Sequence, residues 1–141
     1  MLEFDLRYGM KKIFKGILIF SLIFLISSCG KKKLKDGNYE GTYKDENSSV
    51  KVNITVKDGK ITRCTREERD LKNGKNQIKD ENYAKDDGDY NYKIAQKAVK
   101  NSKGYADKLV EVQDINKVDS VSGATVSCKR FKEAVKNALN K

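Results

Sequence analysis

A run of strict alternation restricts the fold of this chain more than any other feature of its sequence. Between residues 50 and 56 every second residue is aliphatic and those between are polar, the aliphatic ones being Val50, Val52, Ile54 and Val56. Side chains of a strand point alternately to its two faces, so this pattern predicts a strand with one buried face. The Asp58-Gly59 pair suits a tight hairpin turn whose two central residues need positive φ. A second strand, residues 61–66, is therefore expected to return antiparallel.

Neighbouring patterns extend this hairpin to an α+β fold. Alternating Tyr39, Gly41 and Tyr43 predict a first strand over residues 38–44. Helical spacing predicts a helix over 90–101 that ends near Gly104, a short helix after it, and a last helix over 126–139. The apolar stripes of these helices are Ile94, Ala95, Ala98 and Val99, then Tyr105, Leu109 and Val112, then Phe131, Val135, Ala138 and Leu139. We expect an antiparallel three- to four-stranded sheet with the helices packed on one face.

The polar segment 67–89 is expected to be a solvated loop. Its acidic part, Asp86-Asp87-Gly88-Asp89, lacks the order of oxygen ligands and the distal Glu of an EF-hand, so no metal site is assigned. Cys64, in the middle of a predicted strand, is expected to be a small buried apolar side chain. A Cys64–Cys128 disulfide is compatible with an oxidising compartment, and the sequence does not decide it.

The N-terminus reads as a targeting segment. Lys11, Lys12 and Lys15 precede a short apolar run, residues 17–26, as in a secretory signal. The run ends in Ser27-Ser28-Cys29-Gly30, which resembles a bacterial lipobox with Cys29 as the acylated residue. The expected organisation is a signal peptide over 1–28 (1–9 being a start-site artefact), lipidated Cys29 with a basic linker to residue 35, and a domain over 36–141. The alternative is an uncleaved anchor helix that ends in an incidental Cys.

Composition narrows the function classes. The chain has no His, which excludes His-ligated haem and Ser-His or Cys-His catalysis. Its three Cys form no C-x-x-C pair, so zinc and thioredoxin-like chemistry have little support. The net charge of +10 is spread along the chain without a nucleic-acid motif, which favours a Lys-rich solvated surface over nucleic-acid binding. Redox or transfer chemistry would therefore have to be carried by a cofactor.

One stretch before the last predicted helix carries specific chemistry. Residues 119–125, Asp-Ser-Val-Ser-Gly-Ala-Thr, place small residues and a hydroxyl directly ahead of that helix. Together with Asp36-Gly37-Asn38-Tyr39-Glu40-Gly41 and Val56-Lys57-Asp58-Gly59-Lys60-Ile61, this stretch resembles the FMN-binding domain family. That family occurs in the extracytoplasmic flavoprotein subunits of sodium-pumping NADH:quinone reductases and Rnf complexes, and in small bacterial lipoproteins. Its Asp-x-x-Ser/Thr-Gly-Ala-Thr pattern is met at every position from Asp119 to Thr125.

The resemblance implies a covalent cofactor site. In the family the Thr hydroxyl is esterified to the phosphate of FMN by a separate FAD:protein FMN transferase that uses magnesium and releases AMP. It thus implies FMN on Thr125, with Gly123 and Ala124 permitting close approach, Ser122 capping the helix or binding the phosphate, and Asp119 recognised by the transferase. A helix start favours a phosphate because it offers free N–H donors and the positive end of the dipole.

The resulting hypothesis is an electron-transfer flavoprotein rather than a stand-alone enzyme. We expect it at the extracytoplasmic face of a bacterial membrane, held by its lipid anchor. There it would pass electrons from a membrane donor, quinone or NADH-linked, to an extracytoplasmic acceptor. Tyr39, Tyr43 and Tyr83 are candidates to stack on the flavin ring, and ordinary packing is the alternative for each. An alternative function is a surface lipoprotein that carries no flavin and binds a ligand or partner.

Overall fold

A computed structural model describes residues 33–140 of the chain. The predicted signal peptide, its start-site question and the predicted acylation of Cys29 lie outside the described residues. Within the part described, no helix is long and apolar enough to cross a membrane.

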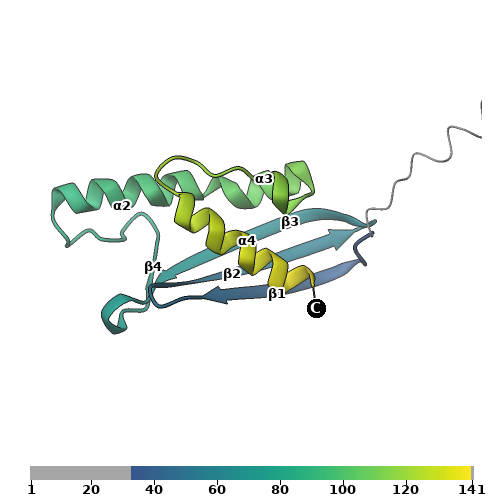
Figure 1. The fold of residues 1–141 in the computed structure, drawn as a ribbon, viewed down its shortest axis with the longest axis horizontal. Helices are drawn as coiled ribbons and strands as arrows, with labels where there is room; N and C mark the ends of the chain where they lie inside the picture. Colours follow the sequence, from purple (N-terminus) through teal and green to yellow (C-terminus); the bar gives the residue numbers. More distant parts are fainter. Residues whose placement is uncertain (1–32, 141) are drawn as a thin grey trace, which may run out of the picture. The chain divides into compact units, whose positions relative to one another are not determined.

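The described chain forms one antiparallel sheet and a layer of helices, which confirms the α+β prediction (Figure 1). The strands are β1 (Gly37–Lys44), β2 (Ser48–Lys57), β3 (Lys60–Asp70) and the short β4 (Gln77–Ile78). They pair in sequence order, each antiparallel to the next. The four alternating aliphatic residues of β2 are all buried, at 3% exposure or less.

The hairpin between β2 and β3 has the geometry that its sequence predicts. Asp58 and Gly59 have φ values of 54° and 73°. The Asp36 carboxylate accepts the N–H groups of Asp58 and Gly59 at 3.0 and 2.9 Å, and these two donors hold the pKa of Asp36 below its usual value. The start of the domain is thereby fastened to this turn.

β3 is longer than predicted, because it runs to Asp70 rather than ending near Arg66. Ser48 pairs with Asp70, so β2 is matched along its whole length. The apolar alternation stops after Cys64 because Glu68 and Asp70, on the same buried face, are charged. Residues 67–70 therefore belong to the sheet and not to the solvated loop that was expected.

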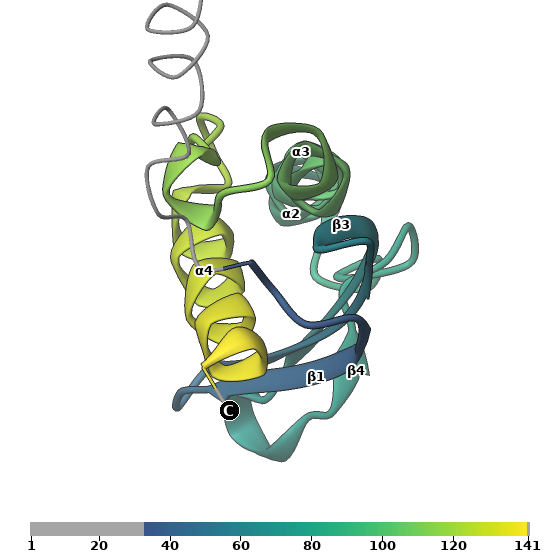
Figure 2. The ribbon, with the colours of Figure 1, turned by 90° about the vertical axis from the view of Figure 1, so that its right-hand side faces the viewer.

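Three helices lie on one face of the sheet, as Figures 1 and 2 show. They are α2 (Asp89–Ser102), α3 (Gly104–Val112) and α4 (Thr125–Leu139), with single 3-10 turns at Lys72–Gly74 and Ile115–Lys117. One detail of the prediction is wrong. Gly104 begins α3 instead of ending the previous helix, since Lys103 keeps helical dihedral angles. On the apolar stripe of α2, Val99 is buried and Ile94 is 54% exposed.

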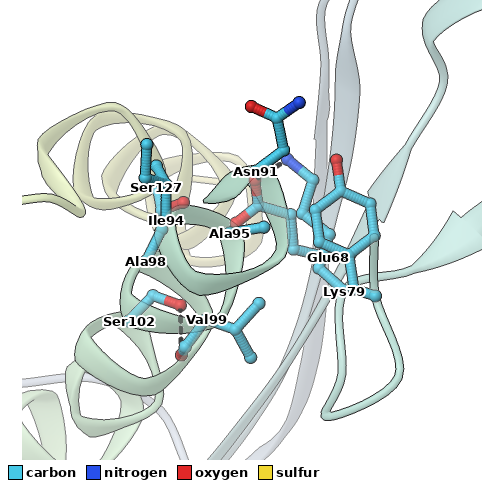
Figure 3. Close-up of a pocket in the computed structure, with 10 residues that line it drawn as sticks. Glu68, Lys79, Asn91, Ile94, Ala95, Ala98, Val99, Ser102 and Ser127 are labelled. Atoms are coloured by element: carbon cyan, nitrogen blue, oxygen red, sulfur yellow. Dashed lines mark hydrogen bonds and ion pairs between the residues drawn. The ribbon is translucent and has the colours of Figure 1, made fainter. Parts of the chain in front are cut away.

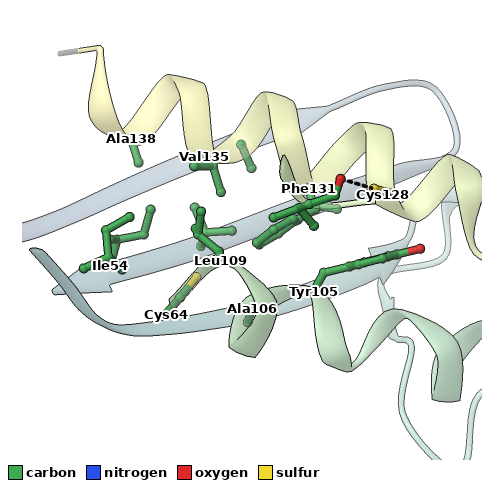
Figure 4. Packing of buried hydrophobic residues seen from close by; sticks show 14 of the residues in the cluster. Ile54, Cys64, Tyr105, Ala106, Leu109, Cys128, Phe131, Val135 and Ala138 are labelled. Atoms are coloured by element: carbon green, nitrogen blue, oxygen red, sulfur yellow. Dashed lines mark hydrogen bonds between the residues drawn. The ribbon is translucent and has the colours of Figure 1, made fainter. Parts of the chain in front are cut away.

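The core lies between the sheet and the helices α3 and α4 (Figure 4). The rings of Tyr105 and Phe131 stack with centroids 6.1 Å apart. Cys64 and Cys128 are both buried free thiols, so no disulfide joins them. Burial raises the pKa of Cys64 to about 11 and also raises that of Cys128, which keeps both sulfurs in the neutral thiol form.

α4 runs antiparallel to β1 and packs closely against it. The Asn137 amide donates to the Thr42 carbonyl at 2.9 Å, and Arg130, nearer the start of α4, donates to Asp45 at 2.6 Å. Gly41 makes the close approach possible, since a Cβ at that position would lie 2.1 Å from the carbonyl oxygen of Ala134. The first turn of α4 consequently lies at the end of the sheet opposite to Asp36.

Candidate functional site

Thr125 is the first residue of α4 and is exposed. Ala124 occupies the N-cap position and no side chain caps the helix. The N–H groups of the first turn are therefore not occupied by a capping side chain, which is the arrangement that favours an anion. The expectation that Ser122 caps the helix is wrong: it lies two positions before the N-cap, and its side chain is exposed.

Two side chains hold the backbone that leads into Thr125. The buried Tyr105 hydroxyl donates to the Ala124 carbonyl at 3.1 Å and accepts the N–H of Val121 at 2.9 Å. From α2, the Asn101 amide donates to the Ser122 carbonyl at 2.8 Å. Tyr105 thus holds the backbone of residues 121–124 from the buried side, and Asn101 connects the same segment to α2.

Gly123 and Ala124 have different roles in this stretch. Gly123 has φ = +82°, which L side chains rarely adopt, while a Cβ there would meet no atom closer than 3.8 Å. A glycine is needed at position 123 because of its positive φ, and not because a larger side chain would lack space. Ala124 is 3% exposed and packs into the core, so its small side chain fixes the start of α4 against the core. Asp119 is exposed.

A pocket of about 250 Å³ lies between α2, β3 and the first turn of α4. Figure 3 shows its lining, which includes Ile94, Ala95 and Ala98 from α2 and Ser127 from α4. Ser127 is two residues after Thr125. Val126, between them, is 58% exposed, so an aliphatic side chain is exposed next to Thr125 in sequence.

Two members of a buried ionic cluster, Glu68 and Lys79, also line this pocket. Glu68, whose side chain is 1% exposed, pairs with Arg66, with Lys79 at 2.8 Å and with Arg130 at 3.4 Å. Burial by itself would raise the pKa of Glu68, but the charge of Arg66 and the hydrogen bond from Lys79 outweigh it and keep the pKa below its usual value. Arg130 also binds Asp45 at 2.6 Å, and the cluster thereby joins α4 to the sheet.

The three tyrosines proposed for stacking lie in two places. Tyr39 and Tyr43 are half-buried and pack against the hydrophobic core from β1. Tyr83 lines the pocket, and its hydroxyl donates to the buried Asp70 carboxylate at 2.9 Å. Burial and the Asp70 carboxylate both raise the pKa of Tyr83, so this tyrosine stays protonated. Of the three, Tyr83 alone lines the pocket beside Ser127.

Comparison with known proteins assigns this arrangement to a family. Residues 46–140 match the sequence model of the family described as FMN-binding domain. The chain belongs to the FMN-binding domain family. The crystal structure of the CPE2226 protein from Clostridium perfringens is similar, at 28% identity and a TM-score of 0.57, over 76% of this chain and 87% of that one. No curated protein matches the chain.

The residues of this FMN-binding domain fit an FMN group. An exposed hydroxyl starts an uncapped helix, which suits a phosphate. A pocket lined by aliphatic side chains and by the Glu68–Lys79 ion pair includes Ser127, two residues further along that helix. In the described part of the chain no cluster of Cys, Asp and Glu could hold a metal ion. A flavin-binding role follows for the chain.

Sequence reasoning missed four residues of this FMN-binding domain that shape the site: Glu68, Lys79, Asn101 and the hydroxyl of Tyr105. Glu68 was placed in a loop because a charged residue breaks apolar alternation. The alternation in the sequence covers residues 50–56 only, and the full length of β2, which pairs as far as Asp70, is seen in the structure. The contacts of Lys79 and Asn101 join segments distant in sequence, and no local pattern indicates them.

Proposed function

We propose that this chain is a membrane-anchored, extracytoplasmic flavoprotein that carries FMN covalently on Thr125 and transfers electrons. Membership of the FMN-binding domain family supports the cofactor. The observation that carries the covalent link is the exposed Thr125 hydroxyl at the uncapped start of α4, held on a backbone fixed by Tyr105.

The link would be made by an FAD:protein FMN transferase acting on this chain. The Thr125 Oγ forms a bond to the phosphorus of the FMN half of FAD, the pyrophosphate bond breaks, AMP leaves and the hydroxyl proton is released. The role of this chain is to present the hydroxyl. Gly123 and the exposed residues around it leave room for a second protein, and Asp119, also exposed, is a recognition point for that enzyme. Ser122 is a candidate to donate to the phosphate.

Electron transfer is the chemistry that a bound flavin supplies. The chain contains no His and offers no second cofactor motif, which favours a carrier over a terminal reductase. A membrane quinone or an NADH-linked system would supply the electrons, and an extracytoplasmic acceptor would receive them. Acylation of Cys29 would keep the domain at high local concentration beside a membrane donor.

Intact-mass analysis tests the covalent link. The full chain is produced with and without a FAD:protein FMN transferase, alongside Thr125→Ala and the matched control Thr65→Ala, which alters an exposed threonine of β3. We expect the wild type and Thr65→Ala to gain the mass of FMN less one water only with the transferase. Thr125→Ala should gain nothing. FMN on Thr125→Ala, or none on the wild type, would refute the proposal and would favour the lipoprotein without a flavin.

Fractionation of cells tests the anchor. Replacing the proposed acylated residue, Cys29→Ser, should move the chain from the membrane fraction to the soluble extracytoplasmic fraction, because acylation provides most of the membrane affinity. Cys64→Ser is the control and should leave the location unchanged. Retention of Cys29→Ser in the membrane would argue for the uncleaved anchor instead.

A further inference from the structure

The pocket beside Thr125 has two unlike walls. Ile94, Ala95 and Ala98 form a flat aliphatic strip on α2, and Glu68 and Lys79 contribute charged groups (Figure 3). A flat aromatic ring with a polar edge matches this combination, since its face can cover the aliphatic strip while its edge approaches the charges.

The pocket lies close to the proposed attachment point. Ser127 lines it and belongs to the turn of α4 that Thr125 begins, although side chains two residues apart project from different faces of a helix. The Asn101–Ser122 hydrogen bond fastens α2 to the segment before Thr125. The ribityl phosphate arm of FMN is the part that would span from an ester at Thr125 to a ring in this pocket. Ile94 is 54% exposed and lines the pocket, so its side chain is accessible to a ligand there.

The charged wall holds a cation at a fixed position. Glu68 pairs with Arg66 and with Lys79, and Lys79 is the cation of this group that lines the pocket. The Nε of Arg66 is buried without a hydrogen-bond acceptor among the described residues. The Lys79 side chain is 17% exposed, and its ammonium also donates to the hydroxyl of Ser48 at 2.8 Å, so the cation is fixed in the wall. The other buried carboxylate of β3, Asp70, accepts a hydrogen bond from the hydroxyl of Tyr83 and keeps its negative charge.

We propose that the isoalloxazine ring of FMN on Thr125 lies in this pocket and that Lys79 is the residue that raises its reduction potential. This inference rests on the proposed function. Uptake of two electrons and one proton converts the neutral oxidised ring into a monoanion, which a nearby ammonium stabilises relative to the oxidised form. Lys79 tunes the flavin through its charge and transfers no proton.

The test is the midpoint potential of the flavinylated full chain, titrated with dithionite as electron donor against a reference dye. Lys79→Met is compared with Lys97→Met, which removes the same charge from an exposed position of α2 that does not line the pocket. We expect Lys79→Met to favour the oxidised flavin by about tenfold more than Lys97→Met, equal to about 30 mV for a two-electron couple. Lys79→Arg should restore most of the shift. Equal potentials for the two Met variants would overturn the inference.

A second pair keeps the test decisive if Lys79→Met unfolds because Glu68 loses a partner. Ile94→Asp places a negative charge in the pocket at an exposed position, and Tyr90→Asp places the same charge on a residue of α2 that is 77% exposed and outside the lining. Ile94→Asp should lower the midpoint potential and shift the flavin absorption bands, and Tyr90→Asp should do neither. Identical behaviour of the two would refute the ring site while FMN remains attached. Absence of FMN mass in the wild type would instead refute the proposed function, and the inference with it.

Discussion

Replacing Gly41 by Ala should separate α4 from the sheet. Gly41 lies on β1 beneath α4, and a Cβ there would be 2.1 Å from the oxygen of Ala134 and 2.5 Å from the nitrogen of Ala138. Both are backbone atoms of a helix, so no flexible side chain can move aside. The first of these distances is more than an ångström short of ordinary contact, which begins at 3.4 Å. The whole helix must shift.

The magnitude follows from what α4 contributes to the core. Phe131, Ala134, Val135 and Ala138 are all buried at 1% exposure or less, and a displaced helix loosens each of their contacts. Overpacking typically costs about 1–3 kcal/mol. We expect the upper end, about 3 kcal/mol, because the clash is with backbone. In a domain of this size that corresponds to a fall in Tm of roughly 12 °C or more.

Urea unfolding followed by far-ultraviolet circular dichroism measures this cost. Gly104→Ala is the matched control, since a Cβ there meets nothing within 4 Å and the residue begins α3. The control should be neutral or stabilised by up to about 1 kcal/mol, through the lower entropy of its unfolded chain. Unfolding free energies of Gly41→Ala and Gly104→Ala that agree within about 0.5 kcal/mol would show that the close packing is not a constraint.

Three further changes test the parts that support the site. Because the folded pKa of Glu68 is lowered, its stabilising contribution is present above its ordinary value of 4.5 and lost as pH falls through the folded pKa. Urea midpoints between pH 7 and pH 3 should therefore depend on pH less in Glu68→Gln, which also loses about 3 kcal/mol at neutral pH; an unchanged slope would contradict this. Tyr105→Phe should cost about 1–3 kcal/mol and slow FMN attachment by the transferase, and an unaltered attachment rate would refute its supporting role. In a Cys29→Ser background, Cys64 and Cys128 should react with a thiol reagent at least about tenfold faster in urea than in the native state, whereas equal rates would contradict their burial.

The sheet and the last helix could be predicted because local patterns define them. Val50 to Val56 alternate without interruption, and Asp58-Gly59 takes the dihedral angles that its residue types favour. The helix that starts at Thr125 follows from its apolar spacing and from the turn residues before it. In each of these cases the information lies within about a dozen neighbouring residues.

The end of β3 and the support of the site could not be predicted in the same way. Glu68 is buried because Arg66, Lys79 and Arg130 converge on it, and Arg130 comes from a helix 62 residues away in sequence. A charged residue in a strand looks solvent-facing until its partners are known. Ile94 shows the converse, because its helical spacing puts it on the apolar stripe of α2 while its side chain is 54% exposed beside the pocket.

The antiparallel packing of α4 on β1 has a consequence for reach. The chain enters the domain at Asp36, fastened to the hairpin turn at one end of the sheet, and Thr125 stands at the other end. If the domain is tethered through Cys29 as proposed, the tether enters the domain beside Asp36, and the flavin on Thr125 lies at the opposite end of the sheet. β1 alone spans about 27 Å between those ends. A flavin on Thr125 would then lie at the end of the domain far from the point at which the tether enters, without any change within the fold.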